Sequence, residues 1–108
     1  MKDLGSLMKQ AQAMQGKLAA AQKELENLVI MGQSGGGVVK VTLRGTGQLE
    51  RVEIDDSLMV PGEGEMVADL VVAAHADAKR QLDARSAELM QQAAGPLAGM
   101  NIPGMPKL

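Results

Sequence analysis

The sequence contains no cysteine, no phenylalanine, tyrosine or tryptophan, and one histidine among its 108 residues. The absence of cysteine excludes a disulfide scaffold, a thiolate metal site and a cysteine nucleophile. The absence of aromatic rings excludes the usual mode of binding single-stranded nucleic acid, in which bases stack on such rings. Bases could still stack on the planar guanidinium groups of arginine. The core must therefore consist of Leu, Val, Ile, Met and Ala, with nine methionines as adaptable filling.

Long apolar runs are also missing. No stretch approaches the roughly 18 residues that a membrane-spanning helix needs, and the N-terminus does not resemble a signal peptide. We therefore expect a cytoplasmic protein. The 11 basic and 13 acidic side chains give a net charge of −2 and an isoelectric point near 5.3. This balance by itself does not indicate a nucleic-acid-binding protein.

The residues that usually carry catalysis are few and isolated. His75 has no carboxylate three or four residues away on either side, and no serine has an evident activating base. The acidic residues between positions 50 and 65 lack the calcium-binding EF-hand pattern, and a solvated acidic face explains them better. We predict no catalytic residue, no metal site and no cofactor, and hence a protein that is not an enzyme.

A glycine-rich stretch at residues 31–41, MGQSGGGVVKV, has the spacing of a phosphate-binding loop but not its chemistry. Gly32 and Gly37 are correctly separated, yet Val38 and Val39 stand where the loop needs Lys and Ser or Thr. A dinucleotide fingerprint fails as well, because Lys40 stands in place of its third glycine. The stretch is best explained as a turn between two strands.

Residues 4–28 carry apolar side chains at spacings that alternate between three and four. This is the heptad pattern of a long helix with a single apolar seam. Gly5 and Gly16 are its weak points, each costing about 1 kcal/mol relative to Ala. The predicted seam consists of Leu4, Leu7, Ala11, Met14, Leu18, Ala21, Leu25 and Leu28.

After residue 28 the pattern becomes that of strands. The segments LVIMGQ, VVKVTLR (38–44) and QLERVEI (48–54) are short and β-prone, and GTG forms a tight turn between the last two. They predict three consecutive antiparallel strands, a meander. Simple alternation places Glu50, Val52 and Ile54 on one face of the last strand and Leu49, Arg51 and Glu53 on the other.

A second long helix is predicted from about residue 65 to residue 93. Its first half is rich in apolar residues, including Val67, Leu70 and Val71, and Gly95 and Pro96 terminate it. Residues 95–108 contain three Pro and three Gly, so we expect a flexible tail. Residues 1–94 are then a single domain.

The predicted lengths favour a symmetric homodimer. The second helix would be roughly 43 Å long, whereas strands of this length span roughly 23 Å, so helix ends would project and sheet edges would stay open. The alternative is a monomer whose first helix folds back on the second. The residues expected in the dimer or core seam are Leu4, Leu7, Met14, Leu18, Leu25, Val67, Leu70 and Val71.

Basic residues gather on the two helices. Residues 1–20 hold Lys2, Lys9 and Lys17 against one acid, so this end is locally positive, and the later half of the second helix adds three more cations. Two interpretations stay open: contacts to DNA phosphates, or ordinary surface charge paired within the second helix. Those pairs would be Asp77 with Arg80, Lys79 with Asp83, and Arg85 with Glu88.

Four segments together resemble the YbaB/EbfC family of bacterial nucleoid-associated proteins. They are LMKQAQAMQGKL, GQSGGGVVKVTLRG, RVEIDDSLM and EMVADLVVAAHADAKRQL, and their order and spacing match the family over about residues 4–94. The resemblance implies an α+β fold of helix, three-stranded antiparallel meander and helix, assembled as a tweezer-like homodimer.

The same resemblance implies binding of double-stranded DNA with limited sequence preference, in the cytoplasm and on the nucleoid, with effects on DNA organisation, gene expression or repair. The family's proposed DNA surface lies toward the projecting helices. The alternative is a dimeric protein-interaction scaffold with incidental DNA binding. The resemblance favours as DNA-binding residues Lys2, Lys9, Lys17, Lys79, Arg80 and Arg85.

Overall fold

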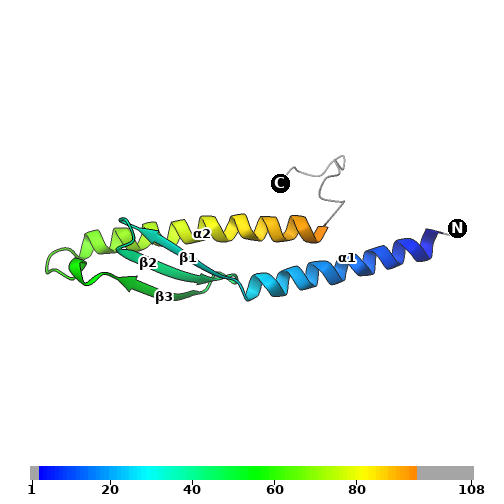
Figure 1. Cartoon of the computed structure of the whole chain (residues 1–108), viewed down its shortest axis with the longest axis horizontal. Helices are drawn as coiled ribbons and strands as arrows, with labels where there is room; N and C mark the ends of the chain where they lie inside the picture. Colours follow the sequence, from blue (N-terminus) through cyan, green and yellow to red (C-terminus); the bar gives the residue numbers. More distant parts are fainter. Residues whose placement is uncertain (1–2, 95–108) are drawn as a thin grey trace.

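The computed structural model describes residues 3–94 and contains two long helices and one three-stranded sheet (Figure 1). This confirms the predicted α+β class and the predicted order of elements. The predicted tail, residues 95–108, lies outside the described residues. The elements are α1 (Asp3–Glu26), β1 (Val29–Ser34), β2 (Val39–Arg44), β3 (Leu49–Ile54), the short 3-10 helix η1 (Asp56–Leu58) and α2 (Gly64–Ala94).

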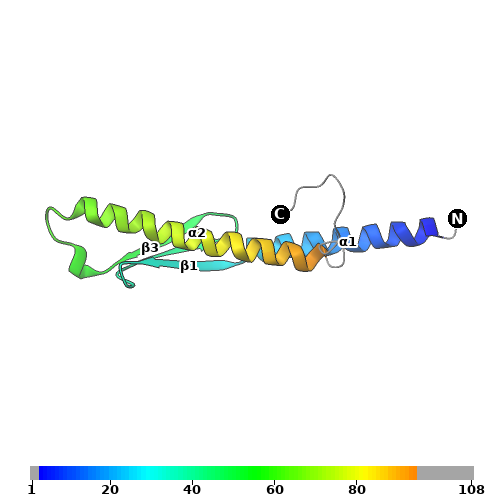
Figure 2. The same ribbon diagram turned by 90° about the horizontal axis from the view of Figure 1, so that it is seen from above.

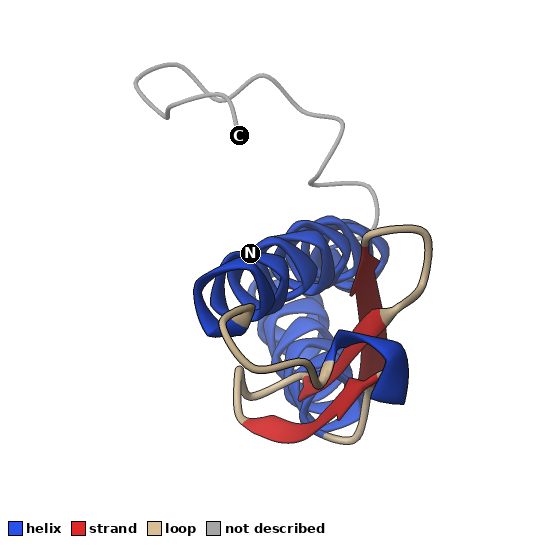
Figure 3. Cartoon of the chain, turned by 90° about the vertical axis from the view of Figure 1, so that its left-hand side faces the viewer, coloured by secondary structure: helices blue, strands red, loops and turns tan. Residues whose placement is uncertain are grey.

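The elements form two layers. The helix α2 is one layer, and the sheet and α1, placed end to end, form the other (Figures 1 and 2). The first half of α2 covers the sheet, and its last turns run antiparallel to α1. Seen along the long axis, the strands lie to one side of α2 (Figure 3). The N-terminal half of α1 extends past the end of α2, and the molecule measures 75 × 26 × 16 Å.

The sheet is the predicted meander, with strand order β1-β2-β3 and both pairs antiparallel. Gly32 lies opposite Val41 in the first pair, and Val41 lies opposite Val52 in the second. The glycine-rich stretch is a turn, as predicted: Gly35, Gly36 and Gly37 have φ angles of 61°, 75° and 99°. Glycine reaches this region without the steric cost of a Cβ, which explains the run of three.

The predicted faces of β3 are wrong at one end of the strand. Thr42 lies opposite Arg51, but Leu43 lies opposite Leu49, so Glu50 is an extra residue in a β-bulge. Leu43 is fully buried, and Leu49 therefore belongs to the inner face of the sheet, the face turned toward α2. A bulge reverses the alternation of side chains beyond it, which a strict period of two does not anticipate.

The core lies between α2 and the inner face of β1 and β2. Val39, Val41 and Leu43 are fully buried there. Gly32 allows α2 to approach β1 closely, because a Cβ on Gly32 would lie 2.3 Å from the carbonyl oxygen of Ala74. Every buried side chain of this cluster is aliphatic, as the composition requires. The cluster consists of Ile30, Val39, Val41, Leu43, Ala74, Ala78 and Leu82.

The heptad seam of α1 finds a partner along only part of its length. Ala21 is buried and Met14 and Leu25 are half-buried where α2 runs beside α1. Beyond the end of α2, Leu4 and Leu7 are 61% and 58% exposed. The remaining predicted seam residues divide in the same way: Leu18 is exposed, Val67 is half-buried, and Leu70 and Val71 pack against the core.

None of the helices within residues 3–94 has an apolar stretch long enough to cross a bilayer.

Candidate nucleic-acid interface

The helix α1 carries a continuous segment of one charge sign. Residues 4–23 contain three lysines and no acidic residue, so nothing within the segment can neutralise them. Lys9, Lys17 and Lys23 are all exposed. None of the three forms an ion pair with another residue of the described range 3–94. Their charges are therefore available to an external anion.

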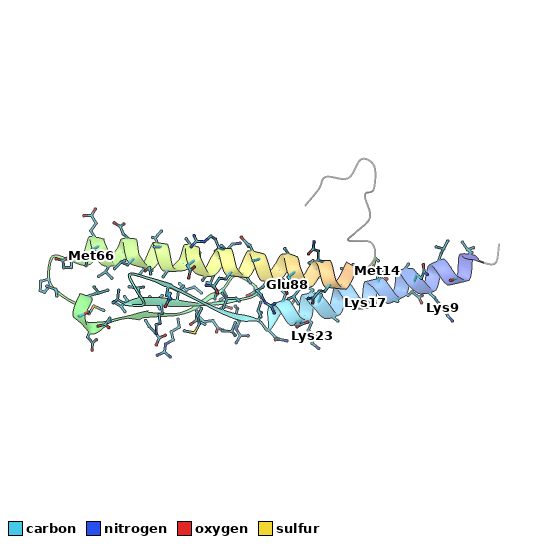
Figure 4. All side chains as sticks on the ribbon, turned by 45° about the horizontal axis from the view of Figure 1, so that its top comes forward. Lys9, Met14, Lys17, Lys23, Met66 and Glu88 are labelled. Atoms are coloured by element: carbon cyan, nitrogen blue, oxygen red, sulfur yellow. The ribbon has the colours of Figure 1, made fainter. Side chains whose placement is uncertain are left out.

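Helix geometry spreads these lysines along one side of α1. Lys9 and Lys23 are about 40° apart around the helix axis and roughly 21 Å apart along it, and Lys17 lies about 80° from Lys9. Figure 4 shows Lys9 and Lys23 on the side of α1 that faces away from α2. A polyanion lying along this side would meet cations at intervals and would not collide with α2.

The basic residues of α2 are placed differently, because each already has an acidic partner. Lys79 pairs with Asp83, Arg80 Nη2 lies 3.4 Å from Asp77 Oδ1, and Arg85 Nη1 lies 3.1 Å from Glu88 Oε2. These are the intrahelical pairs that the spacing allowed. Exposed pairs of this kind contribute little to stability, but they neutralise the three cations of α2, whose five acidic residues leave the helix with no net positive charge. Lys9, Lys17 and Lys23 thus lie on one helix without ion-pair partners within residues 3–94, whereas the cations of α2 are engaged in ion pairs.

Cations on the outer face of the sheet were not singled out by the sequence analysis. Lys40 is exposed and has no ion-pair partner among residues 3–94, whereas Arg44 pairs with Glu50 and Arg51 with Glu53. The alternation of VVKVTLR already placed Lys40 and Arg44 opposite the buried valines. That pattern was the available signal.

The opposite end of the molecule is acidic. Residues 50–77 contain eight acidic residues and one arginine, and the loop between β3 and α2 lies at the end far from the N-terminus of α1 (Figure 1). In that loop Asp55 caps η1, accepting a hydrogen bond of 2.9 Å from the backbone N–H of Ser57. Hydrogen bonds from the Ser57 backbone and then its side chain lower the pKa of Asp55 below its ordinary value of 3.8.

The remaining predicted residues add little to the site. Lys2 lies outside the described residues, and His75 is exposed on α2. Within residues 3–94, no three His, Asp or Glu side chains come together in a group that could hold a metal ion.

Comparison with known proteins points to one family. The sequence model of the YbaB/EbfC DNA-binding family matches residues 1–97. The chain is 68% identical to the nucleoid-associated protein PHZ_c0369 of Phenylobacterium zucineum, over the whole chain and 99% of that protein. It is 66% identical to a nucleoid-associated protein of Caulobacter sp. strain K31, over 97% of this chain and 98% of that one.

The fold has also been seen in a solved structure. An uncharacterized protein of Helicobacter pylori, HP0035, superposes with a TM-score of 0.70, covering 86% of this chain and 98% of its own. The two sequences are 24% identical, so the likeness concerns the fold.

Proposed function

The chain belongs to the YbaB/EbfC DNA-binding family, and we propose that two copies of it bind duplex DNA together through the lysines of α1. The single observation that supports this choice of surface is the contrast between the helices. Lys9, Lys17 and Lys23 are exposed and have no ion pair within residues 3–94, whereas the cations of α2 are paired.

The contacts go to phosphates and carry little sequence preference. Lysine is a point charge that recognises phosphate oxygens, which every sequence presents alike. The relatives are named nucleoid-associated proteins, and we infer the same location here, with a role in DNA organisation that affects expression or repair.

A second copy is needed to cover apolar surface and to double the charge. Leu4, Leu7 and Met8 are each about 60% exposed on α1, an unusual cluster for a monomer surface. Two copies present six α1 lysines within the described residues. If each neutralises one phosphate, the slope of log K against log salt is about −5.

The test replaces two α1 lysines and compares them with two matched cations on α2. In Lys9→Gln/Lys17→Gln, the dimer loses four of the six lysines, and the slope falls to about −2. Lys79→Gln/Arg85→Gln removes the same charge from ion-paired positions, and the slope changes little. Fluorescence anisotropy of a labelled duplex over a series of salt concentrations measures both. An equal loss of slope in the α2 variant overturns the assignment to α1.

A second candidate function, a protein-interaction scaffold, is favoured by the same exposed apolar residues. In this case the α1 stripe at Leu4, Leu7 and Met8 holds a helix of another protein. Two measurements distinguish these functions. If the protein does not bind a DNA duplex even at low salt, and if Leu7→Gln abolishes binding of a partner protein, the scaffold function is favoured.

A further inference from the structure

The cations of the chain are concentrated in its first half. Residues 4–49 contain five Lys and Arg side chains and two acidic residues, whereas residues 50–77 contain one arginine and eight acidic residues. Within the first half, residues 27–49 contain no acidic residue, and their two cations are Lys40 and Arg44 on β2. A second segment without acidic residues therefore follows the one on α1, and it belongs to the sheet.

The two segments face the same side of the molecule. The sheet and α1 form one layer against α2, and Lys9 and Lys23 lie on the side of α1 that faces away from α2 (Figures 1 and 4). On β2 the buried side chains face α2, and the alternating Lys40 and Arg44 are exposed on the opposite, outer face. A surface that runs along this layer, from α1 onto the outer face of β1 and β2, therefore carries both sets of cations.

The end of β2 packs against the end of α1, so this surface is continuous. A Cβ on Gly45 would overlap the carbonyl oxygen of Leu25, and the backbone N–H of Gly45 donates a hydrogen bond of 2.9 Å to the carbonyl oxygen of Leu28. Arg44 therefore lies directly beside the C-terminal end of α1. The two acidic residues of the first half lie in the last turn of α1, so free positive charge is found on either side of this junction.

Lys40 supplies the free positive charge of the sheet. It forms no ion pair with another residue of the range 3–94, whereas both arginines of the sheet are paired. Its cross-strand neighbour on β3 is Glu53, but Glu53 pairs with Arg51 at 3.6 Å. The side chain of Lys40 lies toward the turn between β1 and β2, because a Cβ on Gly37 would be 4.0 Å from Lys40 Cε. Its ammonium group is therefore available to an external anion.

The rest of this half of the sheet does not oppose a polyanion. The outward side chains of β1 are Val29, Met31 and Gln33, and none of them is charged. The acidic residues of the sheet are confined to β3, and each is paired with an arginine. A duplex that continues from α1 therefore meets less repulsion along β1 and β2 than along β3.

We propose that the DNA surface continues from α1 onto the outer face of β1 and β2, where Lys40 contacts a further phosphate of the same duplex. The inference rests on the DNA binding proposed above and extends that site to the sheet. Lys9 and Lys23 are roughly 21 Å apart along α1, and Lys40 and Arg44 are roughly 14 Å apart along β2. Even without the junction, one copy then follows about 35 Å of duplex, or about ten base pairs at roughly 3.4 Å each.

Substitution of Lys40 tests this extension. If each copy of the dimer contacts one phosphate through Lys40, the salt slope of the wild type is about −7, compared with about −5 for the α1 lysines alone. Lys40→Gln should therefore flatten the slope by about 2, and Lys40→Arg, which keeps the charge, should not. Lys79→Gln is the matched control, because Lys79 is paired with Asp83 on α2. Fluorescence anisotropy of the labelled duplex measures all four proteins.

The outcomes separate this inference from the function beneath it. The flattening expected for Lys9→Gln/Lys17→Gln, about 3 to 4, is the same with or without the sheet contact. If that variant flattens the slope and Lys40→Gln does not, the DNA surface ends on α1 and the extension is wrong. If neither variant flattens the slope, the α1 site is wrong as well. If Lys79→Gln flattens it as much as Lys40→Gln, the slope follows net charge, which also overturns the extension.

A photo-cross-link provides an independent measurement. The chain has no cysteine, so a single introduced thiol can be labelled with benzophenone maleimide. Met31 is 53% exposed on the outer face of β1, and Val72 is 68% exposed on α2. Labelled Met31→Cys should cross-link to a DNA duplex, and labelled Val72→Cys should not. Equal yields at the two positions, including no cross-link at either, contradict the placement of DNA on the sheet.

Discussion

Gly32 occupies the point where β1 and α2 come closest. A Cβ there would lie 2.3 Å from the Ala74 carbonyl oxygen and 2.6 Å from the Ala78 Cβ, and backbone cannot move aside as a flexible side chain can. We therefore expect Gly32→Ala to lower the free energy of unfolding by about 3 kcal/mol, as measured by urea denaturation.

Gly16 gives the matched control, with the opposite sign. It lies within α1, and a Cβ there would meet nothing within 4 Å. Gly16→Ala should therefore raise the free energy of unfolding by up to about 1 kcal/mol. Equal effects of the two substitutions would contradict the close packing of α2 on β1.

Asp55 makes the stability depend on acid pH. Its hydrogen bonds from Ser57 favour the charged carboxylate and lower its folded-state pKa below 3.8. The stabilisation is therefore present above the unfolded-state pKa and is lost as pH falls through the folded-state pKa. Urea denaturation at several pH values should show wild type more stable than Asp55→Asn near neutrality, with the difference shrinking below about pH 4. Asp56→Asn is the neighbouring control, and a difference that does not vary with pH would refute the assignment.

At the scale of the elements, side chains of α2 close the β1 edge of the sheet, because Asp77 accepts a hydrogen bond from the backbone N–H of Gln33 and Gln81 donates one to the carbonyl oxygen of Met31. Hydrogen exchange can test this closure. The backbone N–H of Gln33 donates to the Asp77 carboxylate, and Asp77→Ala removes that acceptor. Hydrogen exchange at the Gln33 amide should accelerate severalfold, because a lost hydrogen bond of this kind is worth about 1 kcal/mol.

The control for this experiment is Asp83→Ala on the same helix. Asp83 accepts a hydrogen bond from Lys79 and, within residues 3–94, forms no side-chain hydrogen bond with β1. If exchange at Gln33 accelerates equally in both variants, a general loosening of α2 explains the result and the specific contact does not.

The helices and strands were largely predictable from the sequence, because apolar residues recur along them at the regular spacing of a helix or a strand. The heptad spacing of residues 4–28 indicated α1, and the alternation in VVKVTLR indicated β2. The bulge at Glu50 was not predictable, because an extra residue leaves no mark in a strand of six. The spacing also gave no sign that α2 would cover Ala21 and leave Leu4 bare, since that depends on where the two helices end relative to each other.

The candidate site was predictable in part, for a similar reason. The absence of acids around Lys9 and Lys17 is visible in the sequence. The spacing on α2 permitted ion pairs at Lys79 and Arg85, but only side-chain placement shows that they form. Lys40 was not predicted as a DNA-binding residue because it is the only lysine in its strand, although the alternation of VVKVTLR already placed it on the face opposite the buried valines.

At the scale of the whole molecule, charge is separated along the long axis. Lysines occupy the α1 end, and the acidic residues of the β3–α2 loop and of early α2 occupy the other, near Met66 in Figure 4. The salt slope counts phosphates contacted rather than net charge. We therefore expect Glu63→Gln/Glu65→Gln to leave the slope within about 0.5 of wild type, although it makes the chain less acidic.

Duplex titrations at several salt concentrations check this expectation. The informative comparison is with Lys9→Gln/Lys17→Gln, which changes net charge by the same amount in the opposite direction. A slope that follows net charge in both variants would show that DNA does not distinguish the two ends.

The helix α2 packs against both the sheet and α1. In the last turns of α2, Leu89 and Ala93 are buried, and the packing of these turns beside α1 helps to fix the direction in which α1 points. The C-terminal half of α1 packs beside α2, and the N-terminal half extends past the end of α2 (Figure 1). The helix α1 bends more easily the farther a point on it lies from α2, so in the proposed DNA complex Lys9 would follow a curved duplex while Lys23 stays fixed to the body of the molecule.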